Sequence, residues 1–161
     1  MQARLVSSIM SALVALFLLL GLFTDTASAG EIFAREPLTI LRKNQPPVTL
    51  NVELAVTVPQ REQGLMFRRS MGENEGMLFD FVESRQVFMW MKNTVLPLDM
   101  LFIDERGRVV HIKQGAVPFS ESIIDSVHPV QYVLELLAGS VDRLQLAEGD
   151  EIKSKQIGAK P

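Results

Sequence analysis

The chain contains no cysteine among its 161 residues, and it has only two histidines, one tryptophan and one tyrosine. Catalytic cysteines, thiolate zinc sites and iron–sulfur clusters all need a thiolate, so the sequence excludes these three kinds of site. Disulfides are excluded for the same reason. The fold must therefore be stabilised by side-chain packing without covalent cross-links.

The chain also has no excess of positive charge. Its formal net charge is −3 and its pI is about 5.4, whereas a nucleic-acid-binding domain is expected to carry a basic face. We therefore predict no nucleic-acid partner. The hydrophobic fraction of 47% argues against global disorder, and the length fits one domain.

The N-terminus has the pattern of an export signal. Arg4 precedes an uncharged run, Leu5–Thr24, and Ala27-Ser28-Ala29 supplies the small residues that signal peptidase accepts. We predict a signal peptide over residues 1–29, cleavage after Ala29, and a periplasmic or secreted mature protein. The alternative is an uncleaved anchor, in which case the membrane is contacted through this segment alone.

The rest of the chain is dominated by strand signals, which are β-branched residues and alternation of apolar with polar residues. We divide it into an N-terminal strand and linker (30–47), a β domain (48–153) and a flexible tail (154–161). A mostly β, single-domain sandwich or closed barrel with one or two short helices is expected. The predicted strands are Leu38–Leu41, Val48–Thr57, Gly76–Phe81, Gln86–Met91, Leu98–Ile103, Arg108–Lys113, Tyr132–Leu137 and Glu151–Lys153, and the predicted helices are Pro59–Phe67 and Ser140–Leu146, the latter with Ser140 as N-cap.

Four stretches of the β domain carry a family resemblance. They are Glu62-Gln63-Gly64-Leu65-Met66-Phe67-Arg68, Gly76-Met77-Leu78-Phe79-Asp80-Phe81, Trp90-Met91-Lys92-Asn93-Thr94 with the later Pro97-Leu98-Asp99, and Val133-Leu134-Glu135-Leu136-Leu137-Ala138-Gly139. In these stretches the chain resembles domain-of-unknown-function family 192, the uncharacterised ACR family. The resemblance implies a jelly-roll-like β fold, often behind a signal peptide, and it implies no established reaction.

The polar residues of this region suggest a small-ligand site. The predicted strand that contains Trp90 ends in Lys92 and Asn93, and Asp99 begins the next strand. Together with Arg61 and Glu62 from the first helix, these side chains predict a polar mouth that binds an anion or a polyol against an apolar wall. The competing interpretation is a structural turn in which Asn93 and Asp99 serve the backbone.

Two other functions remain open. A periplasmic hydrolase would use Asp99 or Glu62 together with His111. A copper- or zinc-handling protein would use the thioethers of Met89 and Met91, or would bring both histidines to a carboxylate. No cofactor is predicted, because the sequence has no phosphate-binding loop and no dinucleotide fingerprint.

Overall fold

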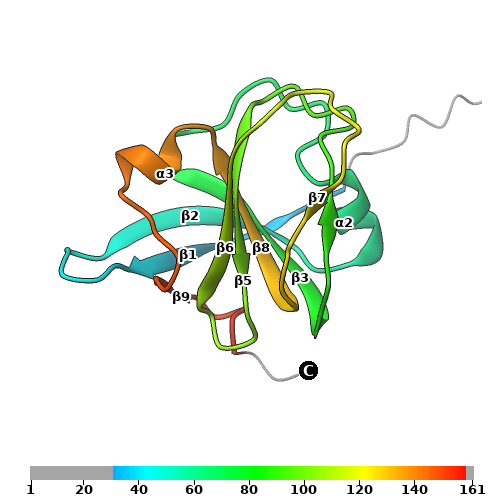
Figure 1. Ribbon diagram of the computed structural model, residues 1–161. Helices are drawn as coiled ribbons and strands as arrows, with labels where there is room; N and C mark the ends of the chain where they lie inside the picture. Colours follow the sequence, from blue (N-terminus) through cyan, green and yellow to red (C-terminus); the bar gives the residue numbers. More distant parts are fainter. Residues whose placement is uncertain (1–30, 159–161) are drawn as a thin grey trace, which may run out of the picture. The chain divides into compact units, whose positions relative to one another are not determined.

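A seven-stranded sheet and a separate two-stranded sheet make up the fold (Figure 1). The computed structural model describes residues 31–158. The large sheet contains β1 (Ala34–Leu41), β2 (Val48–Ala55), β3 (Glu75–Arg85), β5 (Leu98–Ile103), β6 (Val109–Ala116), β8 (Val130–Leu137) and β9 (Glu151–Lys153). The small sheet contains β4 (Phe88–Met89) and β7 (Ile124–Asp125), and the two helices are α2 (Val58–Gln63) and α3 (Ser140–Arg143).

The large sheet curls until its two edge strands approach each other. Its strand order is β6-β5-β8-β3-β2-β1-β9, and β2 and β3 are its one parallel pair. An antiparallel bridge between Arg108 and Glu151 joins the two edges, and the Val109 N–H donates to the Asp150 carbonyl at 2.9 Å. The predicted mostly β, barrel-like single domain with two short helices is therefore confirmed.

The central strand β8 is buried on both faces because each face of the curled sheet carries a hydrophobic cluster. Tyr132, Leu134 and Leu136 belong to the cluster inside the curl. Val133, between them, belongs to a second cluster on the other face, together with Phe79 and Phe102. This two-sided burial follows from the period of two in a strand. It leaves β8 no solvent-facing side along most of its length.

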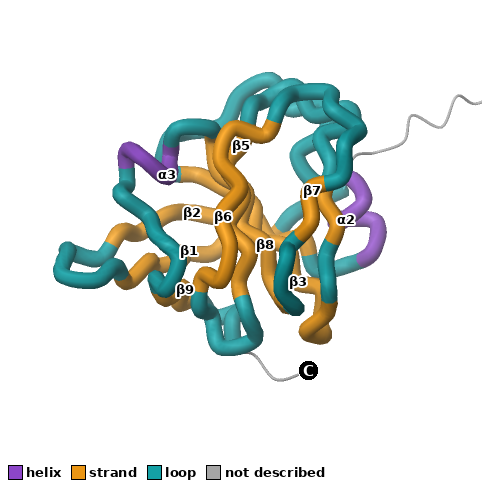
Figure 2. Tube along the Cα trace, viewed as in Figure 1, coloured by secondary structure: helices purple, strands orange, loops and turns teal. Residues whose placement is uncertain are grey.

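Most predicted strands are confirmed, but one strand and both helices are shorter than expected; the second helix, predicted to reach Leu146, ends at Arg143. The predicted strand Gln86–Met91 is reduced to the two residues of β4, and its partner β7 was not predicted. The predicted helix Pro59–Phe67 ends at Gln63, because Gly64 takes φ 47° and ψ −134°, which only glycine populates readily. The chain beyond Gly64 runs as loop, shown in teal in Figure 2.

The two helices begin in different ways. At α2, Thr57 and Gln60 form a reciprocal capping box, and Pro59 lies in the first turn as predicted. At α3 the prediction that Ser140 is the N-cap is wrong. Gly139 holds that position at φ 87° without a side-chain cap, and the carboxylate of Asp99 accepts the Val141 N–H at 3.0 Å instead.

The C-terminal segment 154–158 is held against the sheet rather than frayed as the sequence suggested. The Gln156 side chain donates to Asp80 at 2.7 Å, and its backbone N–H donates to Glu36 at 3.1 Å. Ile157 packs on the inner cluster. The predicted signal peptide lies outside the described residues. Within residues 31–158, no helix is long and apolar enough to cross a bilayer.

Candidate ligand pocket

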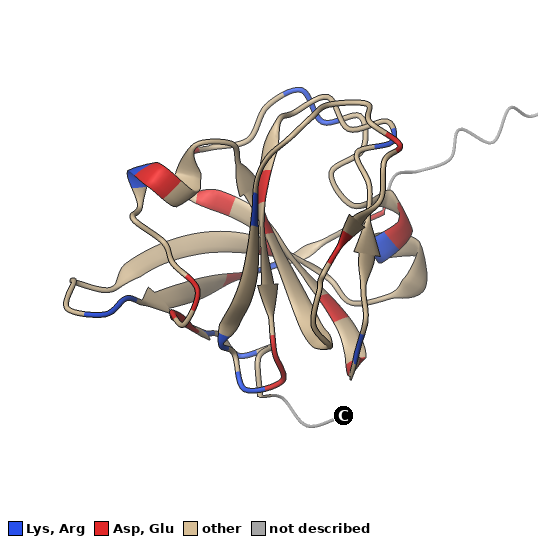
Figure 3. Cartoon of the chain, viewed as in Figure 1, with Lys and Arg blue, Asp and Glu red and all other residues tan. Residues whose placement is uncertain are grey.

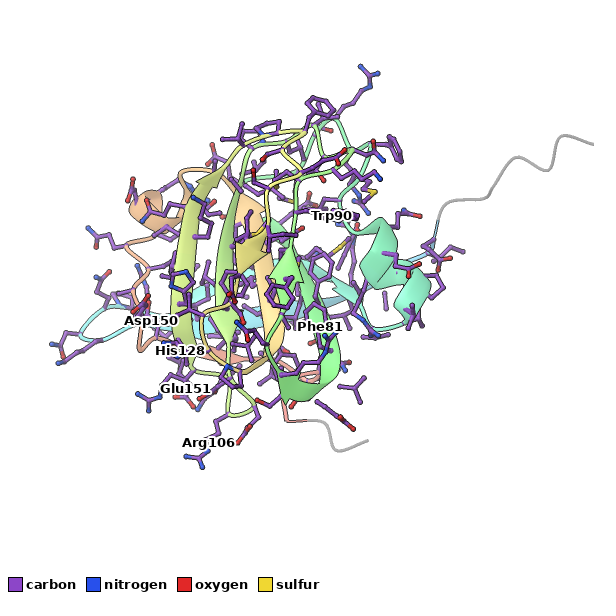
Figure 4. All side chains as sticks on the ribbon, turned by 45° about the vertical axis from the view of Figure 1, so that its right-hand side comes forward. Phe81, Trp90, Arg106, His128, Asp150 and Glu151 are labelled. Carbon is purple, nitrogen blue, oxygen red and sulfur yellow. The ribbon has the colours of Figure 1, made fainter. Side chains whose placement is uncertain are left out.

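A pocket of about 400 Å³ opens on the outer face of the large sheet, beside α2. Its floor lies on β3 and β8, and its walls come from α2, from the loop after α2 and from the segment around β4. Phe81 and Trp90, which both line it, lie on the same side of the molecule as α2 in Figure 4. The apolar lining consists mainly of Leu65, Met66, Phe79, Phe81, Phe88 and Trp90.

Glu135 on β8 is the one acidic side chain that lines this pocket from within the sheet. Its neighbours in register are Met77 of β3 and Met100 of β5, both wholly buried. Glu135 is only 4% exposed, and no residue among 31–158 forms a hydrogen bond with its carboxyl group, whose oxygens are not sealed off from the pocket. Burial among these apolar neighbours raises its pKa to about 8. At neutral pH Glu135 is therefore mostly protonated and can donate a hydrogen bond.

Two guanidinium groups flank the same aromatic ring of the pocket. Arg61 and Arg85 lie 5.7 Å and 5.0 Å from the centroid of Phe81. The Arg61 Nη1 also donates to the carbonyls of Val56 and Asp80, at 2.5 and 2.8 Å, which fixes the orientation of the side chain. Among residues 31–158, neither guanidinium has a carboxylate within 4.0 Å. The pocket therefore has two positive charges without an ion-pair partner.

The segment from Trp90 to Thr94 contributes the mouth of the pocket and a supporting turn. Trp90 is 45% exposed and lines the pocket, and the Lys92 Nζ lies 5.2 Å from the Trp90 ring centroid. Asn93 has φ 56°, and its carbonyl accepts the Phe67 N–H at 2.9 Å. Trp90 is thus placed to contact a ligand, Lys92 lies against it, and Asn93 shapes the turn.

Asp99 is not part of this pocket, so the predicted grouping of Asp99 with Arg61 and Glu62 is corrected. It is 1% exposed, and its two carboxylate oxygens accept the backbone N–H groups of Gly115 and Val141, at 2.9 and 3.0 Å. Both acceptor oxygens are thereby engaged in holding β6 and α3 to β5. The role is structural, as the competing interpretation of the sequence held.

The arrangement that the hydrolase hypothesis requires is not formed. His111 stacks on Phe102, with ring centroids 5.6 Å apart, and its Nδ1 lies 3.4 Å from a carboxylate oxygen of Glu148. It lines a second depression, of about 340 Å³, that does not include Glu62. Glu62 is exposed at the mouth of the first pocket, and Asp99 is shielded from solvent.

The side chains proposed to handle metals are also separated. Met89 lines the first pocket with Met66, whereas Met91 is wholly buried and borders the second depression. In the part of the chain that the structure describes, no three side chains of the types His, Cys, Asp and Glu come close enough to share a metal ion.

The sequence contained one signal for Glu135 that the site prediction did not use. Glu135 is a single acid inside the apolar run Val133–Leu137 of a strand whose two faces are both buried. An ionisable group in such a position needs a partner or a functional reason, because burial of an unpaired charge is costly. Arg61, Glu62 and Trp90 were predicted correctly as neighbours, since all three line the pocket.

Crystal structures of two bacterial proteins are similar to this chain. A protein from Sinorhizobium meliloti 1021, described provisionally as a transcription regulator, is 54% identical, with a TM-score of 0.75 over 77% of this chain and 97% of that one. A protein of unknown function from Novosphingobium aromaticivorans DSM 12444 is 32% identical, with a TM-score of 0.72 over 81% of this chain and 99% of that one. Among curated proteins, none matches. Residues 39–154 match DUF192, the uncharacterised ACR family, and the chain belongs to that family.

Proposed function

We propose that this protein is an exported module that binds a small molecule in the pocket beside α2. The observation that carries the proposal is Glu135, a buried carboxyl group without a protein partner, which lines an aromatic-walled pocket. Carboxyl oxygens that have no protein partner and are not sealed off from the pocket are available to bond a ligand, which makes Glu135 a polar contact at the floor of the pocket. The volume of about 400 Å³ lies within the range of ordinary small-molecule sites.

The charges of the pocket indicate an anionic ligand. Arg61 and Arg85 both lie against Phe81, and Glu135, which is mostly protonated at neutral pH, does not neutralise them. A carboxylate or phosphate on the ligand would supply the missing negative charge and accept hydrogen bonds from both guanidinium groups. The other acid among the lining residues, Glu62, is exposed at the mouth.

The walls indicate a ligand with a ring or another flat apolar body. Phe88 and Trp90 offer aromatic faces that stack on such a body. The proposed ligand therefore has an anionic group near Arg61 and Arg85, a ring near Trp90, and a hydroxyl or carbonyl oxygen that reaches Glu135. A ring acid with hydroxyl groups, such as a uronic acid, meets all three requirements.

The proposal is tested by calorimetry with two pairs of probes, glucuronate against glucose and benzoate against benzyl alcohol. We expect the anionic member of at least one pair to bind at least tenfold more tightly than its neutral counterpart. R85Q should abolish that preference, whereas R106Q, which removes an exposed cation of the β5–β6 turn, should preserve it. E135L, which removes the hydrogen-bonding group from the floor of the pocket, should weaken binding of the sugar acid. If no probe of either pair binds, or if R85Q and R106Q behave alike, the proposed charge recognition is wrong.

The description of the Sinorhizobium relative as a transcription regulator does not change the proposal. Direct regulation of transcription by DNA binding requires a basic surface, and this chain has a net charge of −3 with dispersed basic residues. Export, which the N-terminal pattern predicts, would also separate the protein from the chromosome. We therefore propose that a small molecule, and not a nucleic acid, is the ligand.

A further inference from the structure

A second surface of the molecule combines exposed apolar side chains with unpaired cations. Three loop segments, 66–69, 90–95 and 117–120, meet at one end of the sheet, at the top of Figure 1, and we call this end the apolar loop face. Backbone hydrogen bonds join them. The Phe67 N–H donates to the Asn93 carbonyl at 2.9 Å, the Phe119 N–H to the Thr94 carbonyl at 3.2 Å, and the Met91 N–H to the Ser120 carbonyl at 2.9 Å.

The apolar side chains of this face are unusually exposed for their size. Phe67 is 70% exposed, Val117 is 65% and Phe119 is 62%. Phe67 and Phe119 also have positive φ values, 63° and 61°, which bulky side chains rarely adopt. Phenylalanine at these two positions is therefore explained neither by burial of its side chain nor by the conformational preference of its backbone. A cluster of this kind marks a surface that is covered by something else in the working protein.

The charges of the face indicate what covers it. The three segments contain Arg68, Arg69 and Lys92 and no acid, and the nearest acid along the chain, Glu121, follows the third segment. Arg68 forms an ion pair with Glu53, whereas Arg69 and Lys92 have no carboxylate within 4.0 Å in residues 31–158. Figure 3 shows Lys and Arg positions on the loops at this end. Separate aromatic loop tips among cations match the interface of an anionic membrane better than the flat apolar core of a protein interface.

The place of the N-terminal apolar run in the sequence also favours a membrane as the partner of this face. The described chain begins beside α2, where the Glu31 N–H donates to Gln63 at 2.9 Å, and Phe67 follows four residues after Gln63. The uncharged run Leu5–Thr24 lies a few residues before Glu31 in the sequence. Whether that run is cleaved or retained, it first brings the chain to a membrane. We infer that the apolar loop face docks on the surface of an anionic phospholipid membrane, with Phe67 and Phe119 inserted and Arg69 and Lys92 against lipid phosphates.

The inference is tested with residues 30–161, so that the N-terminal run does not itself insert. These residues hold both hydrophobic clusters, and the Sinorhizobium relative, 97% of which is covered by the similarity, crystallised as a folded protein. Binding is measured on vesicles of phosphatidylcholine alone and on vesicles with equimolar phosphatidylglycerol. The chain has a single tryptophan, Trp90, which lies in the second loop segment. Its fluorescence should shift to the blue when the face enters the lipid interface.

Matched variants distinguish binding through the apolar loop face from nonspecific binding of other exposed apolar or basic side chains. F67N/F119N should lower binding to anionic vesicles at least tenfold, and asparagine suits positive φ, so the variant should fold. V82N/V127N is the control, because both valines are exposed and have positive φ but lie outside the three segments. It should change binding less than twofold. R69Q/K92Q should lower binding about 25-fold, since each cation near an anionic surface contributes about fivefold, and K43Q/R106Q should not.

Three results would each overturn the inference: no binding of the unaltered protein to anionic vesicles, equal binding to both kinds of vesicle, or equal losses in F67N/F119N and V82N/V127N. The pocket is tested independently, because E135L, which alters only the floor of the pocket, should bind vesicles as the unaltered protein does. If the protein does not bind membranes, the proposed ligand binding is not contradicted. If no anionic probe binds in the pocket, the membrane inference is not contradicted.

Discussion

Two acids on adjacent strands of the central sheet show how the same functional group takes opposite roles. Asp99 of β5 pairs in register with Leu136 of β8, next to Glu135. Asp99 accepts two backbone N–H groups, whereas Glu135 has no hydrogen-bond partner among the described residues. Burial without hydrogen bonds raises the pKa of Glu135, whereas both carboxylate oxygens of Asp99 are occupied by the backbone. Asp99 therefore serves the fold, and Glu135 is available to a ligand.

The neutral state of Glu135 predicts a specific dependence of stability on pH. Its pKa rises from 4.5 in the unfolded chain to about 8 in the folded protein, so between these values the folded state holds a proton that the unfolded state has lost. The free energy of unfolding should then fall by about 1.4 kcal/mol per pH unit across this window, about 5 kcal/mol in total. Below pH 4.5 this loss is absent, and above pH 8 it is complete.

The E135Q variant removes the titration and should be the more stable protein at pH 8.5. Urea denaturation at pH 5.0, 7.0 and 8.5 checks this, with E105Q, which alters an exposed acid of the β5–β6 turn, as the control. The gap between E135Q and the unaltered protein should widen as the pH rises. A constant gap would show that Glu135 is ionised in the folded state at all three pH values.

D99N should have the opposite signature. An amide nitrogen cannot accept an N–H group, so one of the two backbone donors, Gly115 or Val141, would be left unpaired in a buried site. We expect the free energy of unfolding to fall by about 1–3 kcal/mol, with binding of the anionic probe unchanged at a temperature where the variant is folded. If D99N lost binding while its free energy of unfolding stayed unchanged, Asp99 would instead belong to the ligand site.

At the scale of elements, the pocket wall depends on how α2 ends. Gly64 closes the helix and lines the pocket, and a Cβ atom at this position would lie 3.1 Å from Cζ of Phe79. G64A should lower the free energy of unfolding by about 1–3 kcal/mol and weaken ligand binding, because both the backbone and the Phe79 ring must move. G115A is the matched control, since Gly115 has φ 60° and no atom within 4 Å of the added Cβ. Thermal unfolding and calorimetry of the two variants should differ.

The elements that were predicted correctly are those whose conformation is determined by residues close together in the sequence. Strand alternation in Val48–Ala55 and the proline near the start of α2 act within a few residues, and both were read correctly. The two-residue strand β7 exists only through its pairing with β4, whose residues lie 35 and 37 positions earlier in register, and it was missed. The error on Asp99 has the same origin, because its partners Gly115 and Val141 lie 16 and 42 residues away. Contacts of this range leave no periodic trace in a single sequence.

At the scale of the whole molecule, export is the prediction with the most direct check. We expect the protein isolated from its native cell to begin at Gly30, because cleavage is predicted after Ala29. Intact-mass measurement of the periplasmic, secreted and membrane fractions distinguishes the two open outcomes. A full-length chain confined to the membrane fraction would show that the leader is retained as an anchor.

The place of β8 between β3 and β5 has a consequence for the motions of the molecule. Strands on both sides bond its backbone, and clusters cover both of its faces, so its amide hydrogens should exchange with solvent only on global unfolding. The six residues of α2 and the loop after it make few such contacts and should exchange by local opening. The pocket thus joins the most slowly exchanging strand to some of the fastest-exchanging segments. A ligand seated there would slow exchange in the walls by opposing local opening, and in the floor by raising the free energy of global unfolding.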